Sequence, residues 1–177
     1  MSTVDMTLLG ALLDAPANAY EMKKKMEYRN IQEWVPVSTP AIYKNLVKLH
    51  REGYLEGTVV REGEMPEKTI YSVNGKGREY FLQLMKKYSA NPRPVYVDFL
   101  VMAANLHHLD RETGLQMIAD LRTKLEYAVG KLEEVVREKR KMPMEGYAVV
   151  DLYLRMYTLF VDWAEDFGEK YARKGEF

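Results

Sequence analysis

Residues 38–53, with the sequence STPAIYKNLVKLHREG, constrain the fold of this chain more than any other segment. Ser38 or Thr39 can cap the start of a helix, Pro40 suits its first position, and Gly53 is a typical helix stop. Apolar residues at positions 42, 46 and 49 recur at helical spacing, which predicts one buried face. The other face contains only small and basic residues, namely Ala41, Lys44, Lys48 and Arg51.

A helix of this kind is suited to the major groove of DNA. Small residues near its start allow close approach to the bases, and lysines meet the phosphates. The chain has 26 basic and 26 acidic residues, but residues 22–51 contain seven basic side chains against two acidic ones. Because salt screens charges beyond about 10 Å, a local patch matters more than the total charge. We therefore expect this region to bind a phosphate backbone.

The segments on either side of this helix predict a winged helix-turn-helix. Two short helices are expected before it, at 6–13 and at 19–28, the second capped by Asn18. After it, β-rich runs at 54–60 and 69–73 enclose a turn-rich stretch and predict a hairpin. Asn74 then caps a further helix over 75–88. The predicted order is three helices, a β-hairpin wing and a helix.

The second half of the chain has a different pattern, which predicts an all-helical domain. Prolines 92 and 94 break the chain, so we place the two domains at 1–90 and 91–177. Apolar residues over 99–106 predict a short helix, and residues 110–141 repeat apolar positions every three or four residues, as in a coiled-coil seam. Pro143 and Gly146 mark a turn before a last helix, about 146–172.

That last helix has two apolar stripes and so needs two packing partners. One partner can be its own domain, and we expect the other to be a second copy of the chain. The alternative is that the second stripe packs on the winged helix. The expected dimer interface consists of Val149, Leu152, Met156, Leu159 and Trp163. The predicted fold class is thus mainly α: an N-terminal winged helix followed by an all-α dimerisation domain.

Three motifs in the first 85 residues or so resemble the PadR family of bacterial and archaeal regulators. Residues 15–21 (APANAYE) are similar to the family's Gly-Pro-x-His-Gly-Tyr-Glu segment. Residues 37–53 carry its Val-Ser, aliphatic-Tyr and Glu-Gly pattern, and residues 71–77 (YSVNGKG) are similar to its wing exit. The chain departs from the family at Asn18, Ala19 and His50. The second half matches in helical layout and length, and not in specific motifs.

The resemblance implies a sequence-specific DNA-binding regulator, in the family's usual mode a repressor that binds a palindromic operator as a homodimer. It implies that Tyr20 and Tyr43 contact the DNA backbone, although packing between the second and third helices is an equal alternative. The wing contains Glu62, Glu64 and Glu67, so we expect it to contribute little affinity except through Lys68. The expected DNA-binding residues are Tyr20, Lys23, Ser38, Thr39, Ala41, Tyr43, Lys44, Lys48 and Lys68.

The family is often controlled by small aromatic molecules, so the resemblance also implies a possible effector as partner. A cluster of aromatic residues is the candidate ligand pocket, although ordinary core packing would use the same residues. The cluster comprises Tyr96, Phe99, Tyr153, Phe160 and Trp163, with Tyr157 beside them.

Other classes of function find less support in the residues. We expect no enzyme, no cofactor and no metal site, because the chain shows no nucleophile–base motif and only a partial glycine-rich pattern at 75–77. His108, Asp110 and Glu112 could be imagined as a metal cluster, but acids at a helix start serve as caps. Without cysteine, a signal peptide or a long apolar run, we expect a cytoplasmic protein. A winged helix that binds only protein remains the alternative.

Overall fold

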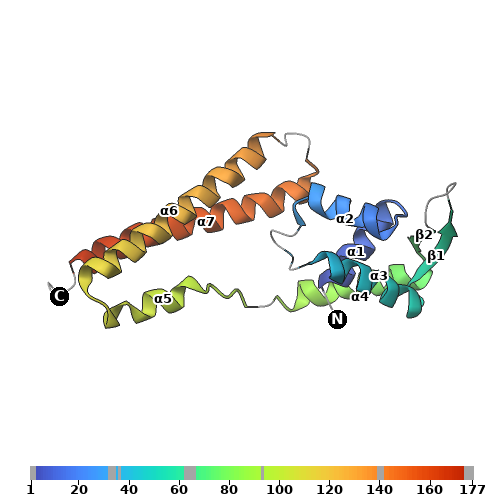
Figure 1. Ribbon diagram of the computed structural model, residues 1–177, viewed down its shortest axis with the longest axis horizontal. Helices are drawn as coiled ribbons and strands as arrows, with labels where there is room; N and C mark the ends of the chain where they lie inside the picture. The colour runs from blue at the N-terminus through green and yellow to red at the C-terminus, as the bar shows by residue number, and fades with distance from the viewer. Residues whose placement is uncertain are drawn as a thin grey trace. The chain divides into compact units, whose positions relative to one another are not determined.

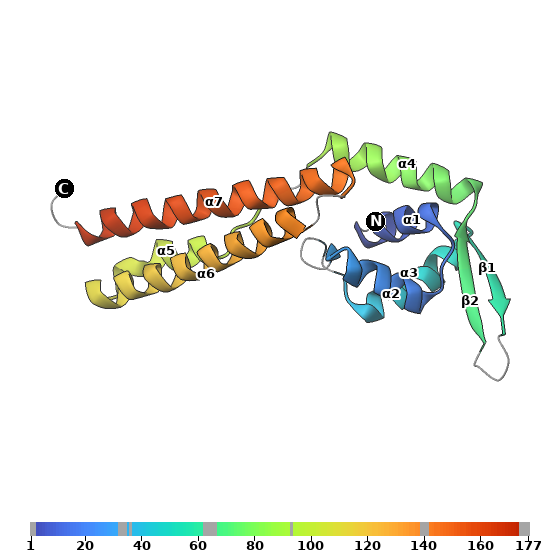
Figure 2. The ribbon, with the colours of Figure 1, turned by 90° about the horizontal axis from the view of Figure 1, so that it is seen from above.

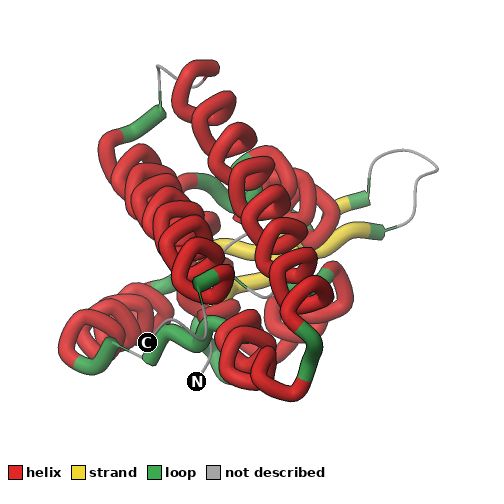
Figure 3. Tube along the Cα trace, turned by 90° about the vertical axis from the view of Figure 1, so that its left-hand side faces the viewer, coloured by secondary structure: helices red, strands yellow, loops and turns green. Residues whose placement is uncertain are grey.

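The computed structural model describes residues 3–31, 35, 37–61, 67–92, 94–138 and 142–173. The chain divides into two compact units, Met1–Pro94 and Val95–Phe177, and each is described by itself. Helices make up most of the described chain, and one two-stranded sheet accompanies them (Figure 3). The predicted fold class, mainly α with an N-terminal winged helix and an all-helical part after it, is confirmed.

Three helices begin the N-terminal unit, α1 (Thr3–Asp14), α2 (Ala19–Tyr28) and α3 (Thr39–Arg51) (Figure 1). Asn18 caps α2 as predicted: its side chain accepts from the backbone of Glu21, whose carboxylate accepts in return from the backbone of Asn18. Ser38 caps α3, with Pro40 in the first turn. Gly53 has φ of +76°, the left-handed conformation that ends a helix and favours glycine.

The wing follows α3 directly. Strands β1 (Leu55–Val60) and β2 (Lys68–Val73) pair antiparallel, with Leu55 opposite Val73 and Val60 opposite Lys68. The backbone of Ala17, just before α2, exchanges two hydrogen bonds with Tyr71 of β2, at 3.0 and 3.1 Å. The base of the wing is therefore attached to the helix-turn-helix. Helix α4 (Gly75–Ala90) then begins at its predicted cap, Asn74.

The core of the N-terminal unit is formed where α1, α2, α3 and the base of the wing meet. The apolar positions predicted for α3 are all fully buried. Helix α1 contributes two leucines with no exposed surface, and α2 contributes two methionines. The side chains with the least exposure are Leu8, Leu9, Met22, Met26, Ile42, Leu46 and Leu49.

The C-terminal unit consists of α5 (Phe99–Asn105), a short 3-10 turn η2 (Leu106–His108), α6 (Arg111–Glu138) and α7 (Met144–Ala172). Helices α6 and α7 run antiparallel along each other, and α5 lies beside them (Figure 2). Gly146, predicted to lie in the turn, belongs to the first turn of α7, because the helix already begins at Met144. No described helix is both long and apolar enough to cross a membrane.

The core of the C-terminal unit is small. Leu106, Ile118 and Tyr171 are its buried members, and Met102, Leu115 and Phe167 pack around them while partly exposed. Arg122 of α6 adds an ion pair of 3.1 Å to Glu165 of α7. Much of the apolar surface of this unit therefore stays accessible to solvent in the single chain.

Candidate nucleic-acid interface

One face of α3 points away from the core and forms the outer strip of this helix. Its members recur at spacings of three and four residues and are Pro40, Tyr43, Lys44, Val47 and Arg51. All of them are exposed, and Val47 keeps 58% of its surface accessible. Val47 lies between Lys44 and Arg51 along this strip. The strip can offer cations to phosphates and an apolar side chain to base edges.

The start of α3 is organised for close approach. The hydroxyl oxygen of Ser38 accepts a hydrogen bond from the backbone N–H of Ala41 at 3.3 Å. Asn45 donates to the carbonyl oxygen of Ala41 at 2.7 Å, so the amide is held against its own helix. No acidic residue occupies the first turn, and Thr39 and Ala41 are half-buried. The first turn of α3 therefore adds no carboxylate of its own to the positive end of the helix dipole.

The two tyrosines implied by the resemblance are largely exposed. Tyr20 of α2 keeps 56% of its surface accessible and Tyr43 of α3 keeps 46%, so both are only partly covered by packing. Lys24 places its ammonium 4.6 Å from the centre of the Tyr20 ring. Lys23 pairs with Glu27 at 3.4 Å on the helix surface, a contact that is readily exchanged in solution.

Lys48 departs from the predicted set. Its ammonium nitrogen lies 2.8 Å from Oδ2 of Asp5 in α1, and the Asp5 side chain is fully buried. Tyr80 of α4 donates a hydrogen bond of 3.4 Å to the same carboxylate oxygen. The hydrogen bond that Lys48 donates to Asp5 raises the pKa of Lys48 above its ordinary value. Sequence spacing placed Lys48 with Lys44, but its charge is engaged by a carboxylate that lies 43 positions earlier.

The structure describes the wing along its two strands, β1 and β2. Lys68, the predicted wing contact, is the first residue of β2, and the acidic side chain of Glu67 before it is exposed. The predicted acidic tip residues Glu62 and Glu64 lie outside the described residues. The imidazole of His50 contacts the carbonyl oxygen of Leu55 at 2.9 Å, so the end of α3 is attached to β1.

The predicted dimer stripe on α7 has two kinds of residue. Leu152 and Leu159 are exposed, at 63% and 62% of their surface. Val149, Met156 and Trp163 are half-buried within their own unit. The Trp163 ring stacks on Phe167 at 5.2 Å between centres and also contacts Phe99 of α5. The two leucines are therefore the residues of this stripe that lack cover in the single chain.

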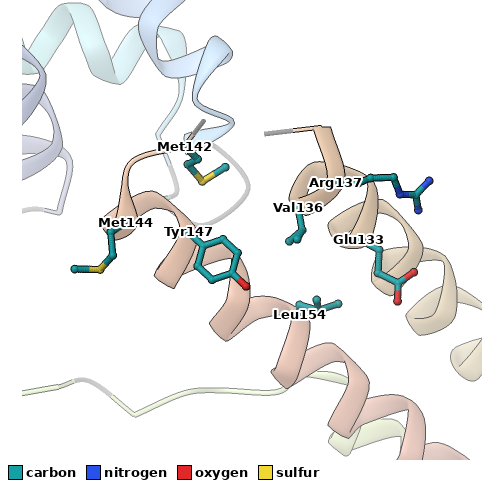
Figure 4. Close-up of a pocket in the computed structure, with 7 residues that line it drawn as sticks. All are labelled: Glu133, Val136, Arg137, Met142, Met144, Tyr147 and Leu154. Atoms are coloured by element: carbon teal, nitrogen blue, oxygen red, sulfur yellow. The ribbon is translucent and has the colours of Figure 1, made fainter. Parts of the chain in front are cut away.

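The predicted aromatic pocket is assembled only in part. Phe99, Phe160 and Trp163 come together, with Tyr157 5.9 Å from Phe160. Burial raises the pKa of Tyr153. Tyr96, also predicted for the pocket, precedes α5 outside any helix or strand and is 90% exposed. An open hollow of about 720 Å³ lies elsewhere, between the end of α6 and the start of α7 (Figure 4), and includes none of the predicted pocket residues.

The imagined metal cluster is not assembled among the described residues, where no three His, Asp or Glu side chains come together to hold an ion. Asp110 instead caps α6, accepting from the backbone N–H of Thr113 at 2.9 Å and from its hydroxyl at 2.7 Å. These hydrogen bonds lower the pKa of Asp110.

The predicted DNA contacts include Tyr43 and Lys44 of the outer strip, but not Pro40, Val47 or Arg51. Val47 is the single apolar residue of α3 outside the buried positions that keeps more than half of its surface exposed. Val47 follows Lys44 by three residues, and this helical spacing could have placed both on the same face of α3.

Comparisons with known proteins agree with this geometry. Residues 8–83 match the family described as Transcriptional regulator PadR-like family. The fold is similar to Bacillus subtilis PadR in complex with operator DNA, with a TM-score of 0.82, 20% identity, and coverage of 94% of this chain and 98% of that one. No curated protein sequence matches the chain.

Two further solved structures have a similar fold over most of the chain. Bacillus subtilis PadR in complex with p-coumaric acid has a TM-score of 0.79 and 18% identity, covering 96% of this chain and 95% of that one. A PadR-like transcriptional regulator from Bacillus cereus has a TM-score of 0.74 and 22% identity, covering 97% and 99%. The resemblance drawn from the sequence motifs is thus confirmed for the winged helix, and the fold is shared along the chain.

Proposed function

We propose, from the match of residues 8–83 to the PadR-like family, that this chain is a transcriptional regulator that binds a palindromic operator as a homodimer. The observation that carries the proposal is the outer strip of α3, where Lys44 and Arg51 flank the exposed Val47. In a winged helix this is the element that enters the major groove.

In the proposed complex, the start of α3 lies against the bases. Ser38, Thr39 and Ala41 are small enough to let the helix approach, and the backbone N–H groups there can meet a phosphate. Tyr20 and Tyr43 donate from their exposed hydroxyls to the DNA backbone, while Lys44 supplies charge. Lys23 and Lys68 reach phosphates at the edges of the contact. Such contacts orient the protein, and base edges provide the selectivity.

Dimerisation gives this contact its selectivity. One winged helix contacts only a few base pairs, whereas two held about one turn of DNA apart recognise an inverted repeat. The exposed Leu152 and Leu159 support an interface on α7, because leucines without cover favour association. Occupying an operator in this way blocks transcription, so we propose repression. A regulator of this kind acts where the chromosome lies, in the cytoplasm.

A small aromatic effector is the proposed control. The solved PadR complex with p-coumaric acid supports this class of ligand, as does the half-buried aromatic cluster around Phe99 and Trp163. Binding of phenolic acids can be followed by fluorescence of Trp163 in a variant with Trp34→Phe. Saturable quenching by one compound and release of DNA at the same concentrations would support the proposal, whereas a flat response from the whole panel would contradict it.

The test of DNA binding is selection of bound sequences from random duplex DNA, followed by titration at several salt concentrations. We expect an enriched inverted repeat and an affinity that falls steeply as salt increases. Lys44→Ala should lower the salt slope, and Lys124→Ala, which removes an exposed lysine from α6, should leave it unchanged. Folded protein without enrichment or salt-dependent binding would favour the protein-binding alternative.

A further inference from the structure

The buried contact among Asp5, Lys48 and Tyr80 is the strongest feature that DNA binding does not itself explain. It joins three helices of the N-terminal unit: Asp5 belongs to α1, Lys48 to α3 and Tyr80 to α4. The Asp5 carboxylate has no exposed surface, and both partners approach its Oδ2 atom. A carboxylate in such a place costs free energy unless it is paired, so its partner is not freely exchanged.

Lys48 would otherwise belong to the DNA-facing side of α3. It follows Lys44 by four residues and precedes Arg51 by three, which places all three along one side of the helix. Its side chain keeps 32% of its surface exposed, although its ammonium lies 2.8 Å from the fully buried Asp5 side chain. A lysine at this place could reach a phosphate if Asp5 did not hold it.

We propose that Asp5 is a specificity-determining residue, which withholds the charge of Lys48 from DNA phosphates while it positions α3 for base contacts. The inference rests on the proposed DNA-binding function. A lysine on a phosphate strengthens binding to every sequence alike, because the phosphate backbone carries no sequence information. By engaging one such lysine internally, the protein lowers its affinity for unspecific DNA and leaves the outer strip to discriminate among sequences.

The test compares Asp5→Asn with Lys48→Gln and with the double variant. Each additional contact between a freed lysine and a phosphate should steepen the log–log dependence of affinity on salt by about 0.9. We therefore expect Asp5→Asn to bind random-sequence duplex more tightly at low salt, with a slope steeper by about one contact. Its preference for the operator over random duplex should fall. Lys48→Gln alone should keep the wild-type slope, and Asp5→Asn with Lys48→Gln should return to it.

Two results would overturn the inference. The first is that Asp5→Asn has the same salt dependence of DNA affinity as wild type and the same preference for the operator. The second is that Lys48→Gln has a salt dependence that is shallower by about one phosphate contact. If wild-type protein shows no salt-dependent DNA binding, the proposed function fails, and the inference fails with it. If wild type binds as expected and Asp5→Asn behaves like it, only the inference fails.

A second measurement needs no variant and covers the case in which Asp5→Asn does not fold. The wild-type protein is treated with an amine-acylating reagent with and without operator DNA, and modified lysines are identified by mass spectrometry. We expect Lys44 to react in free protein and to be protected by DNA. Lys48 should react slowly in both states, since its proton is held by Asp5. Protection of a reactive Lys48 by DNA would overturn the inference.

Discussion

The hydroxyl of Tyr171, near the end of α7, donates a hydrogen bond of 3.1 Å to the carbonyl oxygen of Leu106 in η2. Both residues are buried, and Gly114 of α6 lies against the tyrosine ring with no room for a Cβ atom. The end of α7, the short turn after α5 and the first turns of α6 thus meet at one tyrosine. The small core of the C-terminal unit depends on this contact.

Replacement of Tyr171 by phenylalanine should destabilise the C-terminal unit by about 1–2 kcal/mol, because the buried carbonyl of Leu106 loses its donor. Urea unfolding followed by circular dichroism measures the change. Tyr127→Phe is the matched control, since Tyr127 of α6 is 67% exposed and should tolerate the loss of its hydroxyl. Equal stability of Tyr171→Phe and wild type would mean that water replaces the tyrosine hydroxyl without cost.

Gly114→Ala should also destabilise the protein, by about 1–3 kcal/mol, because its methyl group would overlap the buried ring of Tyr171. Gly130→Ala in the same helix is the control. Nothing lies within 4 Å of a Cβ at position 130, so there alanine should stabilise the helix by about 0.5–1 kcal/mol. Opposite signs at the two glycines are expected in thermal unfolding, and a stabilising Gly114→Ala would contradict this packing.

Features that depend on neighbouring residues in the sequence could be predicted, and contacts between distant residues could not. The caps at Asn18, Ser38 and Asn74 follow from local side-chain-to-backbone hydrogen bonds, so the helices they begin were placed correctly. The partner of Lys48 could not be read from the sequence, because Asp5 lies 43 positions away. Tyr96 has the right chemistry for a pocket, but its 90% exposure could not be predicted from its residue type.

Alkaline pH should weaken the N-terminal unit through Lys48 and Tyr80. The Asp5 hydrogen bond raises the pKa of Lys48, and burial, followed by the charge of Asp5, raises the pKa of Tyr80. Both groups are protonated in the folded state at pH values where the unfolded chain begins to lose its protons. Their contribution to folding stability is therefore complete below the ordinary pKa values of 10.5 for lysine and 10.0 for tyrosine. It is lost as the pH rises through the higher pKa values of the folded state.

The measurement is the midpoint of urea unfolding between neutral pH and the alkaline limit. Tyr80→Phe cannot ionise at this position, so its stability should fall less steeply above pH 10 than that of wild type. The remaining fall should come from Lys48, whose surroundings also include Glu52. Identical alkaline profiles for wild type and Tyr80→Phe would remove Tyr80 from this effect.

Val47→Ala should weaken operator binding without changing its dependence on salt. The substitution removes apolar atoms from the outer strip of α3, worth about 1 kcal/mol if they are buried against base edges. Since no charge changes, the salt slope should equal that of wild type, in contrast to Lys44→Ala. Because Val47 is 58% exposed in the free protein, stability should hardly change. Unaltered affinity for the operator would place Val47 outside the interface.

Leu159→Glu should prevent the proposed homodimerisation and leave the chain monomeric. Leu159 is 62% exposed on α7, so the substitution costs little within one chain, whereas a carboxylate in an apolar interface between two copies would be desolvated. Sedimentation velocity measures the change, and Leu82→Glu on α4, at 53% exposure, serves as the control that should remain dimeric. The monomer should bind a half-site weakly and lose its preference for the inverted repeat, because two helices are no longer presented together. A persistent dimer in Leu159→Glu would move the interface to another face of the C-terminal unit.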